Sequence, residues 1–271
     1  MPAKSQTKQR KRRVRTMSVD GIAEAVELMT REYGPFEQER RLDPADEMVF
    51  TILSQHTSDT NSSRAYARLM ERFGTLEAVA EGTITEIEEA IAPGGLAKIK
   101  APRIKEVLTK VLELNGSLDL AFLREMPLAQ AKAWLRQLPG IGPKSAGIVL
   151  NFSLGMPAMA VDTHIYRVCQ RLGVIEPAVT ADKAHDILEA KVAPEEVFNF
   201  HVSFINHGRQ VCKAQRPLCL ECVVSGVCPS RKKFITAKNI KEEGKSVPTG
   251  NATARRRTGT GQLPHVPQQE G

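Results

Sequence analysis

The sequence predicts an all-α fold built from short helices that are separated by glycine and proline corners. Apolar residues recur at three- and four-residue spacing from about residue 18 to 210, and no long stretch alternates as a strand would. Hydrophobic residues make up 41% of the 271, which is enough for a packed core, and no apolar run approaches the ~18 residues of a membrane span. We therefore expect a soluble globular chain of one or two domains.

Several helices can be placed by their ends. Asp43 is a cap residue and Pro44 suits a first helical position, so a helix is predicted to start there. The segment 83–91, TITEIEEAI, repeats isoleucine with helical spacing. Further along, Pro102 is predicted in the first turn of an amphipathic helix that Gly116 ends.

The segment LPGIGPKSAGIVLN, residues 138–151, predicts a tight turn between two helices, the first of them over residues 127–138. Gly140 and Gly142 permit positive φ and the close approach of another backbone, and the amides around Ile141 lie where the second helix begins. Such a turn binds a DNA phosphate without side-chain chemistry. An ordinary helix corner has the same composition, so both interpretations stay open.

Lys144 stands in the first turn of the second helix, where a cation opposes the helix dipole and a structural role would favour Asp or Glu. The same field, together with partial burial against Ile148 and near Trp134, is expected to favour the neutral amine, which is a nucleophile. Lys144 is therefore a candidate Schiff-base lysine beside a bound phosphodiester, and the alternative is a lysine that only contacts phosphate.

Asp162 precedes the amphipathic run 163–172 and is expected to cap that helix. If the chain folds back so that Asp162 faces Lys144, its carboxylate would stabilise positive charge on a sugar ring. His164 is expected to be a surface or phosphate-contacting side chain rather than a catalyst.

Four of the five cysteines form the pattern C-x6-C-x2-C-x5-C, namely Cys212, Cys219, Cys222 and Cys228. The N-terminus lacks the apolar core of a secretory signal, so we expect a reducing compartment in which these thiolates bind a metal. Tetrahedral zinc and an iron–sulfur cluster both accept four cysteines. Lys213 and Arg216, on the first loop of this site, could contact phosphates, and Cys169 is expected to be a buried small apolar residue.

The net charge of +7 is unevenly distributed along the chain. Residues 1–16 carry seven Lys/Arg and no acid, and residues 231–271 carry nine Lys/Arg against three Glu, which leaves −6 for residues 17–230. Basic arms of this kind usually contact polyanions, so we expect a nucleic-acid partner. The tails, 1–17 and 231–271, are too polar to bury a core and are expected to be disordered.

With the hairpin, the aspartate and the cysteine loop in this order, the chain resembles the endonuclease III family of DNA glycosylases in the helix-hairpin-helix superfamily. The likeness covers about residues 18–230 and is carried by LPGIGPKSAGIVLN with Lys144, AVDTHIYRV with Asp162, and the cysteine spacing. It implies a [4Fe-4S] cluster rather than zinc, and two helical domains with the active-site cleft between them. These would be a six-helix domain, 37–156, and a cluster domain, 18–36 plus 157–230.

The resemblance also implies a bifunctional DNA glycosylase and abasic-site lyase that removes oxidised pyrimidines from duplex DNA in base excision repair. The damaged nucleotide would leave the helical stack, Lys144 would attack its sugar, and Asp162 would stabilise the developing oxocarbenium charge. β-Elimination from the Schiff base would then cut the strand. Gln55 matches the glutamine that the family inserts into the vacated space, and Leu96 matches its apolar wedge.

His56, after Gln55, and Ala97, where several relatives carry tyrosine, depart from the family pattern and leave the lesion preference open. The rival interpretations are a thymine-mismatch glycosylase of the same superfamily and a non-catalytic DNA-binding or redox-sensing protein. The adenine-mispair branch lacks the lysine and needs a further C-terminal domain. We expect a monomer that binds damaged or abasic double-stranded DNA and no membrane. Its expected location is the nucleoid-containing cytoplasm of a bacterium or archaeon, or the nucleus of a eukaryote.

Overall fold

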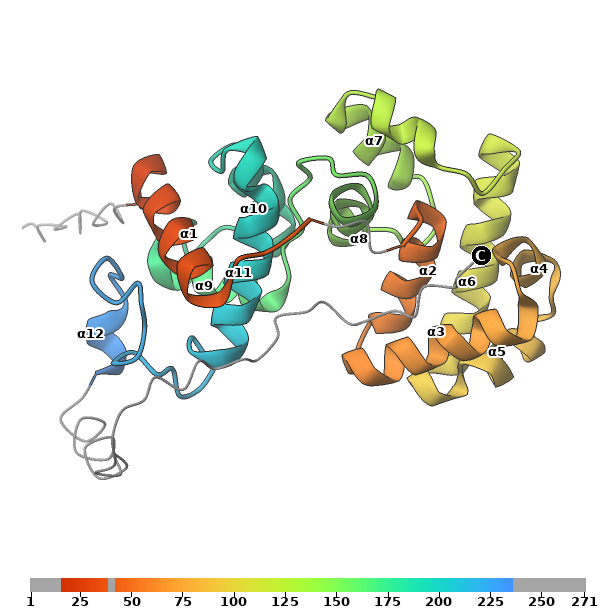
Figure 1. Ribbon diagram of the computed structural model, residues 1–271, viewed down its shortest axis with the longest axis horizontal. Helices are drawn as coiled ribbons and strands as arrows, with labels where there is room; N and C mark the ends of the chain where they lie inside the picture. Colours follow the sequence, from red (N-terminus) through yellow and green to blue (C-terminus); the bar gives the residue numbers. More distant parts are fainter. Residues whose placement is uncertain (1–15, 39–41, 236–271) are drawn as a thin grey trace, which may run out of the picture.

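The structure, a computed structural model, describes residues 16–38 and 42–235 (Figure 1). Every regular element in those residues is helical, which confirms the predicted all-α class. In the part described, no helix combines the length and the apolar character needed to span a bilayer. In chain order the helices are α1 (Val19–Tyr33), α2 (Pro44–Ser54), α3 (Asp59–Phe73), α4 (Leu76–Glu81), α5 (Ile84–Ile91), α6 (Ala97–Asn115), α7 (Leu128–Leu135), α8 (Pro143–Ile148), α9 (Thr163–Leu172), α10 (Ala181–Glu189), α11 (Val197–Gln210) and α12 (Arg231–Phe234), with the shorter turns η1 (Ala92–Gly94), η2 (Ala121–Glu125), η3 (Val149–Ser153) and η4 (Pro194–Glu196).

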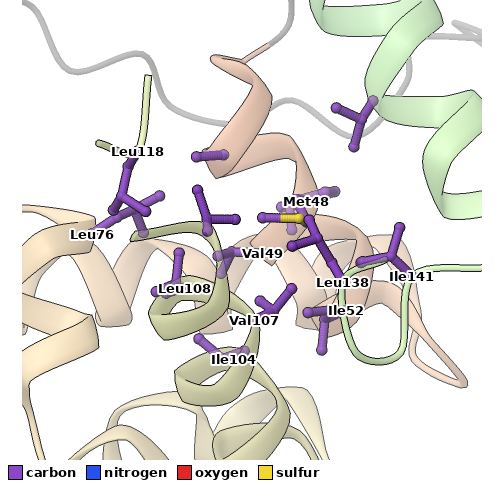
Figure 2. Packing of buried hydrophobic residues seen from close by; sticks show 14 of the residues in the cluster. Met48, Val49, Ile52, Leu76, Ile104, Val107, Leu108, Leu118, Leu138 and Ile141 are labelled. Carbon is purple, nitrogen blue, oxygen red and sulfur yellow. The ribbon is translucent and has the colours of Figure 1, made fainter. Parts of the chain in front are cut away.

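The larger hydrophobic core is contiguous in the sequence and joins α2 to α8, from Ala45 to Ala158. Figure 2 shows side chains of α2 packed against those of α6, with Leu138 and Ile141 beside them. Leu138 and Ile141 are only 2% and 4% exposed although both belong to the turn between α7 and α8. Their burial anchors the turn and leaves its glycines toward the surface.

The second core is assembled from two distant parts of the chain. Helix α1 packs against α11 and shares one core with α9 and α10, so the beginning of the described chain lies beside a helix that ends at residue 210 (Figure 1). Between the two cores, Phe152 stacks edge-on against Phe198 with 5.5 Å between ring centroids, and Val202 completes this small cluster. Helix α8, followed by the π-helical turn η3, lies between the cores and contacts both.

The start of α6 differs from the prediction. The helix begins at Ala97, so Pro102 lies inside it rather than in its first turn. A proline there removes one intrahelical hydrogen bond, to the carbonyl of Lys98, but this residue is exposed and water can replace the bond. The predicted end is correct, because Gly116 caps the helix in the left-handed conformation with φ 73°.

Both predicted tails are shorter than expected. Met17 donates its amide hydrogen to the carbonyl of Gly173 at 2.7 Å and packs against the second core. At the other end residues 231–234 form α12, and the guanidinium of Arg171 lies 4.6 Å from the centroid of the Phe234 ring. The rest of the predicted disorder, at 1–15 and 236–271, lies outside the described residues.

Candidate functional site

Lys144 occupies the first turn of α8, as the sequence predicts, but its side chain is exposed. The expected partial burial is therefore wrong. The turn before it directs apolar side chains into the core, so the polar start of the helix remains at the surface. Gly142 is the N-cap of α8 and supplies no side-chain cap.

Helix α8, which carries Lys144, packs through Gly147 against the segment leading to Asp162. Gly147 lies one turn after Lys144, and residues three apart share a helix face. A Cβ built on Gly147 would be 2.6 Å from the carbonyl oxygen of Met159 and 3.1 Å from Cα of Ala160. Three residues of extended chain span about 10 Å, so Asp162 follows within that length from the contact.

Asp162 caps α9, which confirms its expected local role. Its Oδ1 accepts a hydrogen bond from the amide of Ile165 at 2.7 Å, and its side chain is half-buried. The cap fixes the carboxylate at the start of α9. This position directly follows the segment that packs against α8.

The segment before Asp162 is held from three directions. Asn151 of η3 donates its Nδ2 hydrogen to the carbonyl of Ala158 at 3.3 Å, and Glu189 of α10 accepts from the amide of Met159 at 2.9 Å. From α11, His201 places its Nδ1 3.0 Å from the carbonyl oxygen of Ala160. The buried backbone polar groups are thus paired, and the segment has little freedom to shift.

The hairpin glycines differ from each other. Gly140 has a φ of +76°, a conformation that favours glycine, whereas Gly142 is extended with φ −87° and does not use the positive φ that glycine permits. A Cβ at either position would meet nothing within 4 Å. The described structure therefore gives Gly142 no internal reason to lack a side chain, and an external group that approaches this backbone would supply one.

His164 is half-buried rather than fully on the surface. Its Nδ1 accepts from Nη2 of Arg167 at 3.1 Å, because a guanidinium can only donate, and its Cβ side packs over Gly208. Burial lowers the pKa of His164, with smaller contributions from the positive charges of Arg167 and Arg209, while Asp162 acts in the opposite direction. These causes favour a neutral imidazole.

Gln55 and Leu96, the residues matched to DNA insertion, lie on neighbouring loops. Gln55 ends α2, and its Oε1 accepts from Nη1 of Arg103 at 3.4 Å, a partner that the sequence analysis did not identify. Leu96 is 49% exposed and adopts a left-handed conformation. The hydroxyl of Thr57 donates to the carbonyl of Gly94 at 2.7 Å and so connects the two loops.

The four predicted ligand cysteines line one apolar cavity with an empty volume of about 350 Å³, including its opening to solvent. In the range 42–235 none of the four forms a disulfide. Burial, followed by the other three cysteines, raises the pKa of Cys222 to about 12. Four cysteines that line one cavity and form no disulfide suit a cationic group that binds thiolates, so the residues present fit a four-cysteine metal centre. Among the described residues, no group of three or more His, Cys, Asp or Glu side chains is already close enough to hold a metal ion, so the fit rests on the cavity that the four cysteines share.

Helix α9 holds the cysteine loop through two arginines that the sequence analysis missed. Arg171 donates from Nη1 to the carbonyl of Lys213 and from Nη2 to that of Ala214, both at 2.7 Å. Arg167 donates from Nε to the carbonyl of Cys212 at 3.0 Å. The side chains of Lys213 and Arg216 themselves are exposed, and Cys169 is fully buried as expected.

Polar contacts also connect the two cores. Lys132 of α7, only 12% exposed, lies 2.9 Å from Oε1 of Glu189 on α10. On the surface, Arg209 of α11 contacts Asp59 of α3 at 3.1 Å. Both pairs join residues more than fifty positions apart, so no local spacing in the sequence indicates them.

Residues 49–194 match the family described as HhH-GPD superfamily base excision DNA repair protein. Endonuclease III of Thermotoga maritima is 33% identical over 190 residues, which cover 70% of this chain and 84% of that protein. Endonuclease III of Escherichia coli K12 is 31% identical over 190 residues, which cover 70% of this chain and 85% of that protein. A solved structure of endonuclease III trapped as a covalent intermediate with DNA superposes with a TM-score of 0.69 at 27% identity, covering 80% of this chain and 99% of that one.

Proposed function

Because this chain belongs to the endonuclease III family of base excision DNA repair proteins, which are DNA glycosylases and abasic-site lyases, we propose that Lys144 is its nucleophile and Asp162 its charge-stabilising carboxylate. The observation that carries the assignment is the contact between Gly147 and Met159, which holds α8, one turn after Lys144, against the segment that ends at Asp162. The exposure of Lys144 agrees with a side chain that must reach a sugar on another molecule.

In the proposed reaction the uncharged amine of Lys144 attacks C1′ of the damaged nucleotide. The glycosidic bond breaks, and the base leaves with the bonding electrons and takes up a proton. Positive charge develops on the sugar ring during this step, and the Asp162 carboxylate stabilises it. After the ring opens, the Schiff base makes the C2′ proton acidic. Its loss expels the 3′ phosphate and cuts the strand, and water then releases the lysine.

We propose that DNA lies across the hairpin and the loops beside it. The open backbone at Gly140, Ile141 and Gly142 would bind a phosphate without side chains. Gln55 and Leu96 would occupy the space left by the flipped nucleotide. Lys213 and Arg216, and the imidazole of His164, would contact the backbone further along.

We further propose that Cys212, Cys219, Cys222 and Cys228 hold a [4Fe-4S] cluster. When bound, the cluster would cross-link this loop and hold Lys213 and Arg216 in place. Iron and sulfide content and the visible thiolate-to-iron absorbance of anaerobically purified protein test this assignment. A colourless protein with one zinc per chain would contradict it.

We also propose that the two cores correspond to domains 37–156 and 18–36 plus 157–230.

Borohydride trapping tests the nucleophile. Duplex DNA with an abasic site and borohydride should give a covalent adduct with the intact protein, and Lys144→Ala should abolish it. Asp162→Asn is a matched variant, because asparagine can still cap α9 but carries no charge. We expect Asp162→Asn to keep the thermal stability and to lose at least ~100-fold in base excision, as an electrostatic stabiliser would. No adduct with the intact protein would favour a DNA-binding protein without catalysis.

The proposed substrates are oxidised pyrimidines in duplex DNA. A panel of duplexes that carry thymine glycol, dihydrouracil, oxidised guanine or a G·T mismatch tests this point by single-turnover excision. Preferential excision of thymine from the mismatch would replace the proposed substrate by that of the rival thymine-mismatch glycosylase.

A further inference from the structure

Helix α6 carries a lysine inside the protein. Lys100 is 2% exposed, and its Nζ donates to the carbonyl of Leu53 at 2.6 Å, to the hydroxyl of Thr57 at 2.6 Å and to the carbonyl of Gly94 at 3.3 Å. Three acceptors match the three hydrogens of an ammonium group. Burial lowers the pKa of Lys100, so the cationic form depends on these oxygens.

The three acceptors lie beside the two residues assigned to DNA insertion, with Leu53 in the last turn of α2, Thr57 in the loop after it and Gly94 before α6. Leu53 and Thr57 lie on either side of Gln55, and Gly94 lies two residues before Leu96. The Thr57 hydroxyl accepts a hydrogen bond from Lys100 and donates one to the carbonyl of Gly94 at 2.7 Å. One buried ammonium thus connects both loops directly and through a shared hydroxyl.

Both loops contain an unusual backbone conformation. Among the described residues, the non-glycine positions with positive φ are His56 at 52° and Leu96 at 56°. A left-handed residue costs about 1–2 kcal/mol and persists where its surroundings hold it in place. Lys100 bonds to backbone or side chain on both sides of His56 and close to Leu96, so it is placed to hold both conformations.

The lysine is also not needed to fill the core. A methionine would occupy a similar volume in α6 without the cost of burying a charge. Leu96, by contrast, is an apolar side chain left 49% exposed, and Ile99, one turn later, is 51% exposed. The buried charge and the exposed wedge therefore occur at the same end of the same helix.

We propose that Lys100 is a positioning residue that sets the spacing between Gln55 and Leu96, so that both side chains enter the gap left by one flipped nucleotide. The inference rests on the proposed function for the insertion roles of Gln55 and Leu96. Lys100 itself does not touch the DNA and acts through the two loops.

A second lysine of α6 provides a matched control. Lys105 donates to the carbonyls of Ala80 at 2.9 Å and Gly82 at 2.5 Å, so it fastens the end of α4 by the same chemistry but contacts neither insertion loop. Lys100→Met and Lys105→Met each remove an ammonium from backbone acceptors. Lys100 is buried and Lys105 half-buried, so the two variants can differ in stability, and a purely structural role predicts that any loss in DNA binding follows the loss of thermal stability in both.

The readout is the fluorescence of 2-aminopurine placed opposite a tetrahydrofuran abasic analogue in duplex DNA, which rises when the orphan base is unstacked by the inserted side chains. At saturating protein we expect Lys100→Met to lose most of the wild-type rise and about tenfold in affinity for this duplex. Lys105→Met should keep both, and thermal melting of each variant reports its stability. Thr57→Val removes only the shared hydroxyl and should give an intermediate loss, which carries the test if Lys100→Met does not fold.

The inference would be overturned if Lys100→Met gave the same fluorescence rise as the unmodified protein. It would also be overturned if Lys105→Met lost as much of the fluorescence rise as Lys100→Met. A wild-type protein that traps on abasic DNA but gives no fluorescence rise would overturn it as well, while leaving the proposed function intact. Failure of the wild-type protein to form a borohydride adduct would instead refute the proposed function.

Discussion

Gly147 lies directly against the carbonyl of Met159, so closely that a Cβ at residue 147 would be 2.6 Å from this oxygen. The oxygen belongs to an extended segment held by α10, α11 and η3, so it has little room to move. The missing side chain of one glycine therefore determines how near the Lys144 helix can come to the chain that carries Asp162.

Gly147→Ala should push α8 away from this segment. Alanine normally stabilises a helix by about 1 kcal/mol relative to glycine. Here we expect the free energy of unfolding to fall by about 1–3 kcal/mol, because the added methyl group overpacks a rigid contact. Urea unfolding measures the stability and borohydride trapping the activity, which should fall further than the stability does. A more stable variant with full trapping would contradict the contact.

Gly142→Ala should have the opposite pattern. The residue is extended with φ −87° and open space around it, so alanine fits and the free energy of unfolding should stay the same or rise by up to about 1 kcal/mol. If DNA approaches this backbone, the methyl group obstructs one phosphate contact and costs about tenfold in affinity. Fluorescence anisotropy with an abasic duplex measures the affinity, and an unchanged value would place the DNA elsewhere.

Glu189 connects the two cores through Lys132 and also accepts from the amide of Met159. Glu189→Gln keeps an oxygen for that amide but loses the charge, so we expect about 1 kcal/mol of destabilisation, and Glu189→Ala should cost about 2–3 kcal/mol. Glu113→Gln is the control, since its pair with Lys110 is exposed at 2.9 Å and should contribute less than about 0.5 kcal/mol. Equal effects at the two sites would show that the link between the cores is weak.

His185 makes stability depend on pH. Burial lowers its pKa in the folded protein, Lys132 adds to this, and Asp182 acts in the opposite direction. Above about pH 6.5 the unfolded imidazole is also neutral and the residue has no effect, whereas below it the unfolded chain binds the proton more readily and stability falls. His185→Leu should reduce the difference in unfolding free energy between pH 7.5 and 5.5. His164 and His207, whose pKa values burial also lowers, should keep part of it.

The terminal segments should govern the salt dependence of DNA binding. Residues 1–15 carry +7, and residues 236–271 carry six Lys/Arg against three Glu, or +3. Removing both segments should weaken non-specific affinity and lower the slope of log K against log salt by about 0.9 for each phosphate that the protein no longer neutralises. Titrations at several salt concentrations measure the slope, and a slope equal to that of the full chain would show that these segments do not contact DNA.

Local signals in the sequence predicted the helices and their ends where neighbouring residues decide them. Pro44 starts α2, Asp162 caps α9, and Gly116 ends α6 as expected, whereas Asp43 occupies the N-cap position of α2 without a capping hydrogen bond to its side chain. Each of these signals acts within four residues, through a cap or a left-handed glycine, so the sequence contains the whole cause. The assignment to the endonuclease III family, made from three motifs, is confirmed by the similarity to its members.

Long-range contacts could not be predicted in this way. Lys100 looks like any solvated helical lysine until the fold places the carbonyl of Leu53, 47 residues earlier, beside its Nζ. Arg171 is similar, because its partners lie 42 and 43 residues later. The expected burial of Lys144 is wrong because the fold turns Leu138 and Ile141 of the hairpin into the core and leaves Lys144 exposed. Tertiary packing decides these cases.

The arrangement of the two cores along the sequence determines the order in which they can fold during translation. Everything from Ala45 to Ala158 is supplied by one unbroken stretch, so that body can condense while the ribosome is still translating the C-terminal third of the chain. Of the described helices α1 is synthesised first, yet its partner α11 comes more than 160 residues later, as does the cysteine loop of the same core. The apolar side chains of α1 are therefore exposed to solvent until α11 has been synthesised, and they form a binding site for chaperones during that time.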